Sequence, residues 1–102
     1  MGRKALEVGD VSKAAAIIFE RIREKRGLNK KDVYLGVGIP SSSRYQALIK
    51  GTSVWTLDDV ELFATFHKIP LKSAFILIEK ELHSIISEKS RLYLGTAGNF
   101  AS

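Results

Sequence analysis

The chain has 102 residues, of which 45% are hydrophobic and 26% are charged, and it contains no cysteine. This length and balance are typical of one folded domain and argue against an intrinsically disordered chain. Without cysteine there is no disulfide and no thiolate metal site, so we expect a reducing, cytoplasmic setting. The longest apolar runs, residues 14–19 and 74–78, are too short to span a bilayer, and no apolar signal core follows the first residues.

The net charge of +5 is unevenly distributed along the chain. Residues 1–31 carry nine Lys or Arg against four acids, whereas residues 56–102 carry five against six. A basic front half with a near-neutral back half is typical of a protein that binds a polyanion such as nucleic acid. Many ordinary solvated helices are basic as well, so charge alone does not identify the partner.

An Ala-rich pattern with helical period predicts an amphipathic helix over residues 11–26. We expect Asp10 or Ser12 to cap its start and Gly27 to close it in left-handed geometry.

A short second helix is predicted over residues 30–37, capped by Asn29. The turn after it contains Gly38, which accepts positive φ, and Pro40, which keeps the preceding residue out of helical geometry. The expected inward residues are Val33, Tyr34 and Val37.

A third helix is predicted over residues 41–50, between the capping hydroxyl of Ser41 and the terminal Gly51. Its inward stripe is Tyr45, Leu48 and Ile49. Its opposite stripe is Ser43, Gln46, Ala47 and Lys50, with Arg44 on the flank. The outward groups are a hydroxyl, an amide, a methyl and an ammonium, without a carboxylate. Such a surface suits the major groove of DNA, and the alternative is an ordinary solvated helix face.

Two more helices complete the predicted domain. Thr56 is expected to cap the fourth, where Asp58, Asp59 and Glu61 are read as favourable helix-start charge. Its expected buried residues are Leu57, Val60, Phe63, Ala64 and His67. Pro70 is expected to start the last helix, whose seam is Leu71, Phe75, Ile78, Leu82 and Ile85.

The end of the last helix carries more apolar surface than a small domain covers by itself. Leu82, Ile85, Ile86 and Leu92 are therefore candidates for a homodimer interface. The alternative is that this segment folds back on its own domain. The expected division of the chain is a flexible arm at 1–10, a DNA-binding domain at 11–79, a helical extension at 80–94 and a flexible tail at 95–102.

Four short patterns occur in order along the chain. They are F-x-x-I-R-x-x-x-G-L-N at 19–29, V-x-x-x-V-G-I at 33–39, Y-x-x-L-x-x-G at 45–51 and W-T-L-x-x-V-x-x-F-A at 55–64. In this order the chain resembles the helix-turn-helix of the lambda-repressor/Cro-like family over roughly residues 14–78. The resemblance implies an all-α, compact five-helix lambda-repressor-like helix-turn-helix domain with an extended C-terminal helix. It also implies a transcriptional regulator, most simply a phage or bacterial repressor on the nucleoid, often dimeric on a pseudo-palindromic operator in double-stranded DNA.

The chain departs from the family pattern at three places. Tyr34 stands where the family usually has alanine, the turn is one residue longer through Pro40, and Ile49 replaces a usual glutamate. The first two departures imply either that the two helices lie further apart or that the third helix is tilted.

Carrying the family pattern over from Gly51 assigns the residues that contact DNA. The base-contact residues implied are Ser42, Ser43, Arg44, Gln46 and Ala47. The phosphate-contact residues implied are Asn29, Lys30, Ser41, Lys50, Thr52 and Ser53. Arg44 holds either a base or a phosphate, and Arg23 is expected in a structural salt bridge rather than on DNA. Arg3 and Lys4 either form an arm around the duplex or belong to a disordered start.

Other classes of function find less support in the sequence. His67 and His83 are the only histidines and lie in different helices, and no catalytic or phosphate-binding loop motif is present. We expect no enzyme activity, cofactor, metal, small-molecule ligand or membrane association. The stronger rival is a protein-interaction module, such as an antitoxin or adaptor of the same fold, which uses the last helix to grip a partner.

Overall fold

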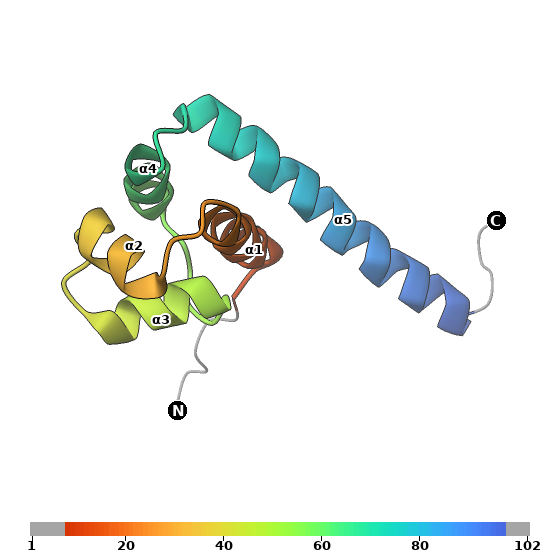
Figure 1. Cartoon of the computed structure of the whole chain (residues 1–102). Coiled ribbons are helices and arrows are strands. Elements are labelled where there is room, and N and C mark those ends of the chain that lie inside the picture. Colours follow the sequence, from red (N-terminus) through yellow and green to blue (C-terminus); the bar gives the residue numbers. More distant parts are fainter. Residues whose placement is uncertain (1–7, 98–102) are drawn as a thin grey trace.

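The computed structural model describes residues 8–97, and the side chains of residues 8–91. This part of the chain forms five helices and no strand. They are α1 (Asp10–Lys25), α2 (Lys30–Val37), α3 (Ser42–Lys50), α4 (Leu57–Phe66) and α5 (Leu71–Ala97). In Figure 1, α1 lies at the centre, with α3 on one side of it and α5 on another. The predicted all-α class is confirmed, although α5 continues through residues 95–97, which were expected in the flexible tail.

Three predicted helix caps are confirmed. The Asn29 side chain accepts the Asp32 N–H at 2.8 Å, and the Ser41 hydroxyl accepts the Arg44 N–H at 3.2 Å. Thr56 forms a reciprocal capping box with Asp59. Because α2, α3 and α4 start on these local hydrogen bonds, their starts follow from the sequence.

The cap predicted for α1 is wrong. Gly9 occupies the cap position without a side-chain hydrogen bond. The Ser12 hydroxyl lies 2.8 Å from the backbone nitrogen of Trp55 and accepts its N–H, and Asp10 forms an ion pair with Lys89. Both candidate caps are thus used by partners from distant parts of the chain.

Glycines in left-handed geometry bound α3 on both sides. Gly38, for which positive φ was predicted, has φ +78°, and Gly51, which was predicted to end the helix, has φ +74°. Residues 38–41 form the connection between α2 and α3, so the turn includes Pro40. The predicted closing residue of α1, Gly27, also has positive φ.

An aromatic cluster from four segments forms the centre of the core. Phe63 of α4 lies 5.3 Å from Phe19 of α1 and 4.7 Å from Trp55, measured between ring centroids. Tyr45 of α3 stacks on Phe63 at 6.1 Å. The Trp55 indole N–H donates to the Leu48 carbonyl at 2.9 Å, so its polar atom is satisfied inside the core. These contacts fix α3 to α1 and α4.

The buried side of α4 differs from the prediction at one residue. Val60, Phe63, Ala64 and His67 are buried as expected, but Leu57 is 74% exposed. Leu57 is the first residue of α4. The buried position near this end of the helix belongs instead to Asp59, which lies in the first turn of α4 as expected of a helix-start charge.

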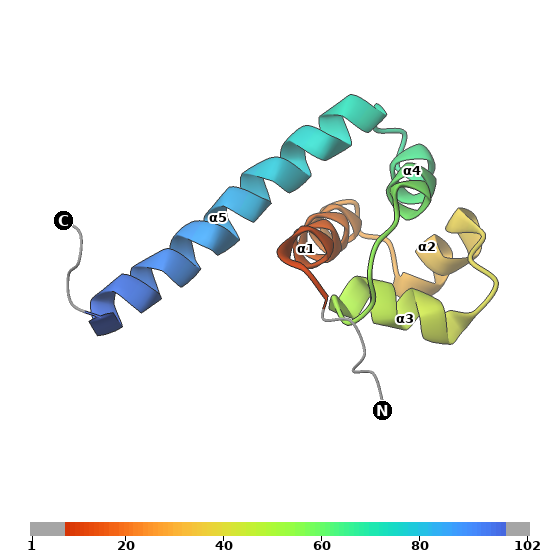
Figure 2. The same cartoon turned by 180° about the vertical axis from the view of Figure 1, so that it is seen from behind.

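The α5 helix lies alongside α1 and not alongside α3, as two opposite views show (Figures 1 and 2). Ala74 and Ile78 are buried, and Leu82 and Ile85 pack partly against the same core. Leu82 and Ile85 are therefore partly covered by their own domain, which was the alternative to a dimer interface. Ile86 remains 45% exposed, and the side chain of Leu92 lies outside the described residues.

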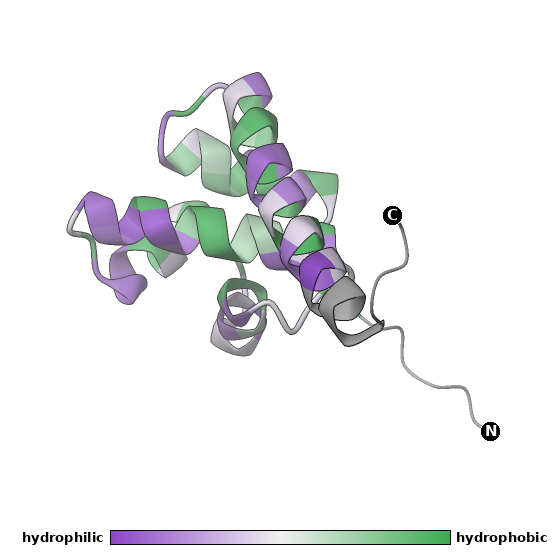
Figure 3. Ribbon diagram, turned by 90° about the vertical axis from the view of Figure 1, so that its right-hand side faces the viewer, coloured by the Kyte–Doolittle hydropathy of each residue, from purple (hydrophilic) through white to green (hydrophobic). Residues whose placement is uncertain are grey.

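Hydrophilic and hydrophobic residues alternate along α5 (Figure 3). Among the described residues, no helix combines the length and the apolar character needed to cross a membrane.

Candidate nucleic-acid interface

The two predicted faces of α3 are both present. Tyr45, Leu48 and Ile49 are buried, and they anchor the helix against α1 and α4. Ser42, Ser43 and Lys50 are exposed, and Gln46 and Ala47 are half-exposed. Because α5 packs on α1, the outward face of α3 is not covered by the long C-terminal helix (Figure 1).

A shallow hollow of about 190 Å³ lies between α2 and the outward face of α3. Its lining residues are Lys30, Lys31, Tyr34, Ser42, Tyr45 and Gln46. Two of these residues, Tyr34 of α2 and Tyr45 of α3, have ring centroids 5.6 Å apart, so their rings pack together where the two helices meet. The hollow brings the predicted phosphate-contact Lys30 beside the predicted base-contact residues Ser42 and Gln46.

Positive charge borders this surface. Lys30 and Lys50 are exposed, and within residues 8–91 neither forms an ion pair. Lys30 is the first residue of α2, where the free backbone N–H groups and the helix dipole also favour an anion. The lining of the hollow contains no carboxylate, so nothing there repels a phosphate.

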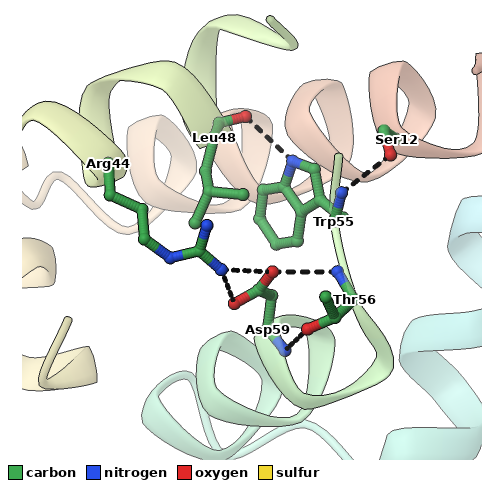
Figure 4. Close-up of polar contacts among 6 residues, drawn as sticks. All are labelled: Ser12, Arg44, Leu48, Trp55, Thr56 and Asp59. Carbon is green, nitrogen blue, oxygen red and sulfur yellow. Dashed lines mark hydrogen bonds and ion pairs between the residues drawn. The ribbon is translucent and has the colours of Figure 1, made fainter. Parts of the chain in front are cut away.

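Arg44 does not project from α3 as a free side chain. Its Nη2 lies 2.7 Å from Oδ1 and 2.9 Å from Oδ2 of Asp59, whose side chain is only 6% exposed (Figure 4). Asp59 also accepts the Thr56 N–H at 2.8 Å, so one carboxylate caps α4 and holds Arg44. Sequence reasoning missed this pair, because the two residues are 15 positions apart and share no local pattern.

Arg23 has the structural role that was expected of it. Its guanidinium bonds both carboxylate oxygens of Glu20 at 3.1 Å and donates to the Leu28 carbonyl at 2.8 Å. The hydrogen bond to Glu20 raises the pKa of Arg23 above its ordinary value. This arginine therefore stabilises the end of α1.

Several other predicted phosphate-contact residues already make local hydrogen bonds. The Thr52 hydroxyl donates to the Ala47 carbonyl at 3.3 Å, while Asn29 and Ser41 cap their helices. The oxygens of Asn29 and Ser41 act as acceptors, which leaves the Asn29 amide and the Ser41 hydroxyl hydrogen as donors. Ser53 is half-exposed, and Arg3 and Lys4 lie outside the described residues.

Two buried polar atoms in the described side chains have no partner, the Tyr45 hydroxyl and Nε2 of His67. Burial, reinforced by Glu20, raises the pKa of Tyr45 to about 12. Burial and the nearby Arg26 lower the pKa of His67 to about 4. Arg26 can only donate, so at 2.8 Å it bonds a bare Nδ1, and Nε2 carries the proton of a neutral ring. His67 is thus a neutral core residue at physiological pH.

No group of three potential ligands in the described residues is placed to hold a metal ion. Comparisons with family models, curated proteins and solved structures found no match to this chain. A functional assignment therefore depends on α2, α3 and the residues around them.

Proposed function

We propose that the chain is a sequence-specific transcriptional regulator that binds double-stranded DNA, most simply a repressor of phage or bacterial type. In this proposal α2, the turn at 38–41 and α3 form a helix-turn-helix of the lambda-repressor/Cro-like kind. The observation that supports it best is the outward face of α3, which is uncovered and free of carboxylates on a helix whose other face is fully buried. An α-helix presented in this way fits the major groove.

Base recognition is assigned to the outward residues of α3. The Gln46 amide can form a bidentate pair with adenine N6 and N7, which typically discriminates by about 1–3 kcal/mol. Ala47 is small enough for close approach and suits the methyl group of thymine. Ser42 and Ser43 can donate or accept, so they contact bases without fixing which base is read.

Phosphate contacts are assigned to the residues that border this face. Lys30 is placed to hold one backbone together with the N–H groups at the start of α2. Lys50, Thr52 and Ser53 follow the recognition helix and are assigned to the next phosphates. These contacts position the helix but do not read sequence.

Selection of bound duplexes from a random pool, followed by fluorescence anisotropy at several salt concentrations, tests the proposal. Gln46→Ala should relax base preference at one position. Lys30→Ala should weaken binding to all duplexes and make the slope of log affinity against log salt less steep by about one. Lys80→Gln, an exposed change on α5, is the control for loss of one charge. Failure of the wild-type chain to bind any duplex at low salt would contradict the proposal.

A protein-interaction module is the second candidate, and the apolar side chains exposed on α5 favour it. Phe75, Ile76 and Ile86 are 38%, 46% and 45% exposed. They fit either a homodimer or a heteromeric partner. Analytical ultracentrifugation beside a gel shift on random duplex separates the cases, since a monomer that retards no DNA would favour a heteromeric partner.

A further inference from the structure

Arg44 is the only charged residue of α3 besides Lys50, and it is the one whose direction is set by another helix. Both contacts to Asp59 come from the same nitrogen, Nη2. Within residues 8–91 the remaining guanidinium N–H groups, on Nε and Nη1, make no hydrogen bond, and 41% of the side chain is exposed. The guanidinium is therefore fixed in place, and its Nε and Nη1 N–H groups remain available to donate hydrogen bonds.

The position of Arg44 around α3 decides what those donors can face. Successive residues in a helix are about 100° apart, which places Arg44 between the buried Leu48 and the outward Ala47. A helix with its side chains is about 10–12 Å across, and the major groove is about 12 Å wide. The flanks of an inserted helix consequently face the two phosphate backbones, while only its tip and outward face reach the bases.

The hollow that contains Lys30 lies on the other side of α3, next to Ser42 at the tip of the helix and Gln46 on its outward face. Lys30 and Arg44 therefore lie on different sides of the recognition helix. The hollow side carries Lys30 and Lys31 and the α4 side carries Arg44, so each of the two backbones that wall the groove has at least one cation beside it. Lys30 and Arg44 differ in conformational freedom, because Lys30 forms no ion pair among the described residues and Arg44 is held by Asp59.

Building on the proposed function, we infer that Arg44 is a phosphate-binding residue that bridges Asp59 and the DNA backbone. Nη2 stays on the carboxylate of Asp59, and the remaining N–H groups donate to one phosphate on the α4 side of α3. Of the two contacts left open for Arg44 by the sequence, a base or a phosphate, this inference selects the phosphate. Asp59 holds the guanidinium in the orientation it needs before DNA arrives, and Arg44 neutralises a buried carboxylate that would otherwise repel the phosphate.

The test measures affinity for the selected duplex from 50 to 200 mM salt. Affinity falls as salt rises, so the slope of log affinity against log salt is negative. Arg44→Gln should make this slope less steep by about 0.9, so the loss of affinity from 50 to 200 mM salt shrinks by about threefold. Lys80→Gln, the matched loss of a remote exposed charge, should keep the wild-type slope.

Arg44→Gln also leaves Asp59 as an unpaired buried charge, so a fold defect must be separated from a lost phosphate contact. The double variant Arg44→Gln/Asp59→Asn replaces the ion pair with a neutral hydrogen-bonded pair, and its thermal unfolding confirms that it is folded. The double variant should still show the less steep salt dependence. A folded double variant with the wild-type slope would show that Arg44 only supports α3, and the inference would be wrong. If wild type binds no duplex at all, it is the proposed function that fails.

Discussion

The four-helix core, α1–α4, and the distal half of α5 are held by different kinds of contact. In the core, rings from α1, α3, α4 and the loop before α4 interlock around Phe63. Beyond residue 79, α5 is held by the half-buried Leu82 and Ile85 and by two ion pairs, Arg21–Glu81 and Asp10–Lys89. Apolar burial is worth more than exposed ion pairs, so the core should fold cooperatively while the end of α5 adds little.

This contrast places the proposed DNA-binding surface on the stable part of the molecule. The helix α3 is fixed by three buried residues and by the Arg44–Asp59 pair, as recognition of base edges requires. The distal part of α5 is free of that constraint.

The largest expected effect comes from the same substitution made in the two regions. Phe63→Ala should reduce the free energy of unfolding by about 3–5 kcal/mol, which is a large share of the stability of a small domain. Phe75→Ala on α5, where the ring is 38% exposed, should cost roughly 1 kcal/mol. Urea unfolding followed by circular dichroism measures both, and similar losses would contradict the contrast.

The two histidines give a comparison that depends on pH. The pKa of His67 is about 4 in the folded chain and close to 6.5 when unfolded, so between these values only the unfolded chain binds the proton. The contribution of the neutral His67 to the free energy of unfolding is therefore fully present above pH 6.5 and is lost as pH falls toward 4. The loss is on the order of 3 kcal/mol.

His67→Phe should remove this part of the pH dependence, whereas His83→Gln, at an exposed site on α5, should leave it unchanged. The free energy of unfolding at pH 7, 5.5 and 4 is the measurement. Because carboxylates also titrate in this range, the comparison is between variants. A wild-type pH profile in His67→Phe would show that His67 is not buried as a neutral ring.

A close approach between α2 and α4 gives an intermediate effect. A Cβ on Gly36 would overlap the Phe66 ring, so Gly36→Ala should destabilise by about 1–3 kcal/mol despite the better helix propensity of alanine. Combining it with Phe66→Ala should recover part of that loss. The two single variants and the double variant form a cycle, and a coupling energy near zero would mean that the two helices do not meet at this point.

The smallest effect is expected at the exposed ion pair near the end of α5. Lys89→Ala should change the free energy of unfolding by less than about 0.5 kcal/mol, because Lys89 is 62% exposed and exposed pairs contribute little. Lys80→Ala serves as the control, since Lys80 is an exposed lysine of the same helix that forms no ion pair within residues 8–91. A loss above about 1 kcal/mol for Lys89→Ala alone would show that the distal part of α5 belongs to the cooperative core.

The features predicted well from sequence are those that a few neighbouring residues decide. The caps at Asn29, Ser41 and Thr56 and the left-handed Gly38 and Gly51 depend on hydrogen bonds within one turn. The two faces of α3 follow from helical period. All of these survive in the structure, because no distant contact competes with them.

The features predicted poorly are those that distant residues decide. Ser12 serves Trp55 instead of capping α1, Arg44 meets Asp59, and Leu82 and Ile85 pack on their own core. Leu57 has the period of a core residue but is exposed at the start of α4. In each case the partner depends on how two helices meet in space.

The sequence by itself determined which segments of the chain are helical, how α2, α3 and α4 begin, and which side of α3 carries its polar groups. Each of these depends on backbone geometry and on hydrogen bonds between residues a few positions apart. Only the tertiary structure decided that Arg44 is held by α4 and that α5 lies along α1, leaving the polar side of α3 uncovered. Those choices depend on how the helices pack against one another, which brings together residues up to 79 positions apart, as in the ion pair between Asp10 and Lys89.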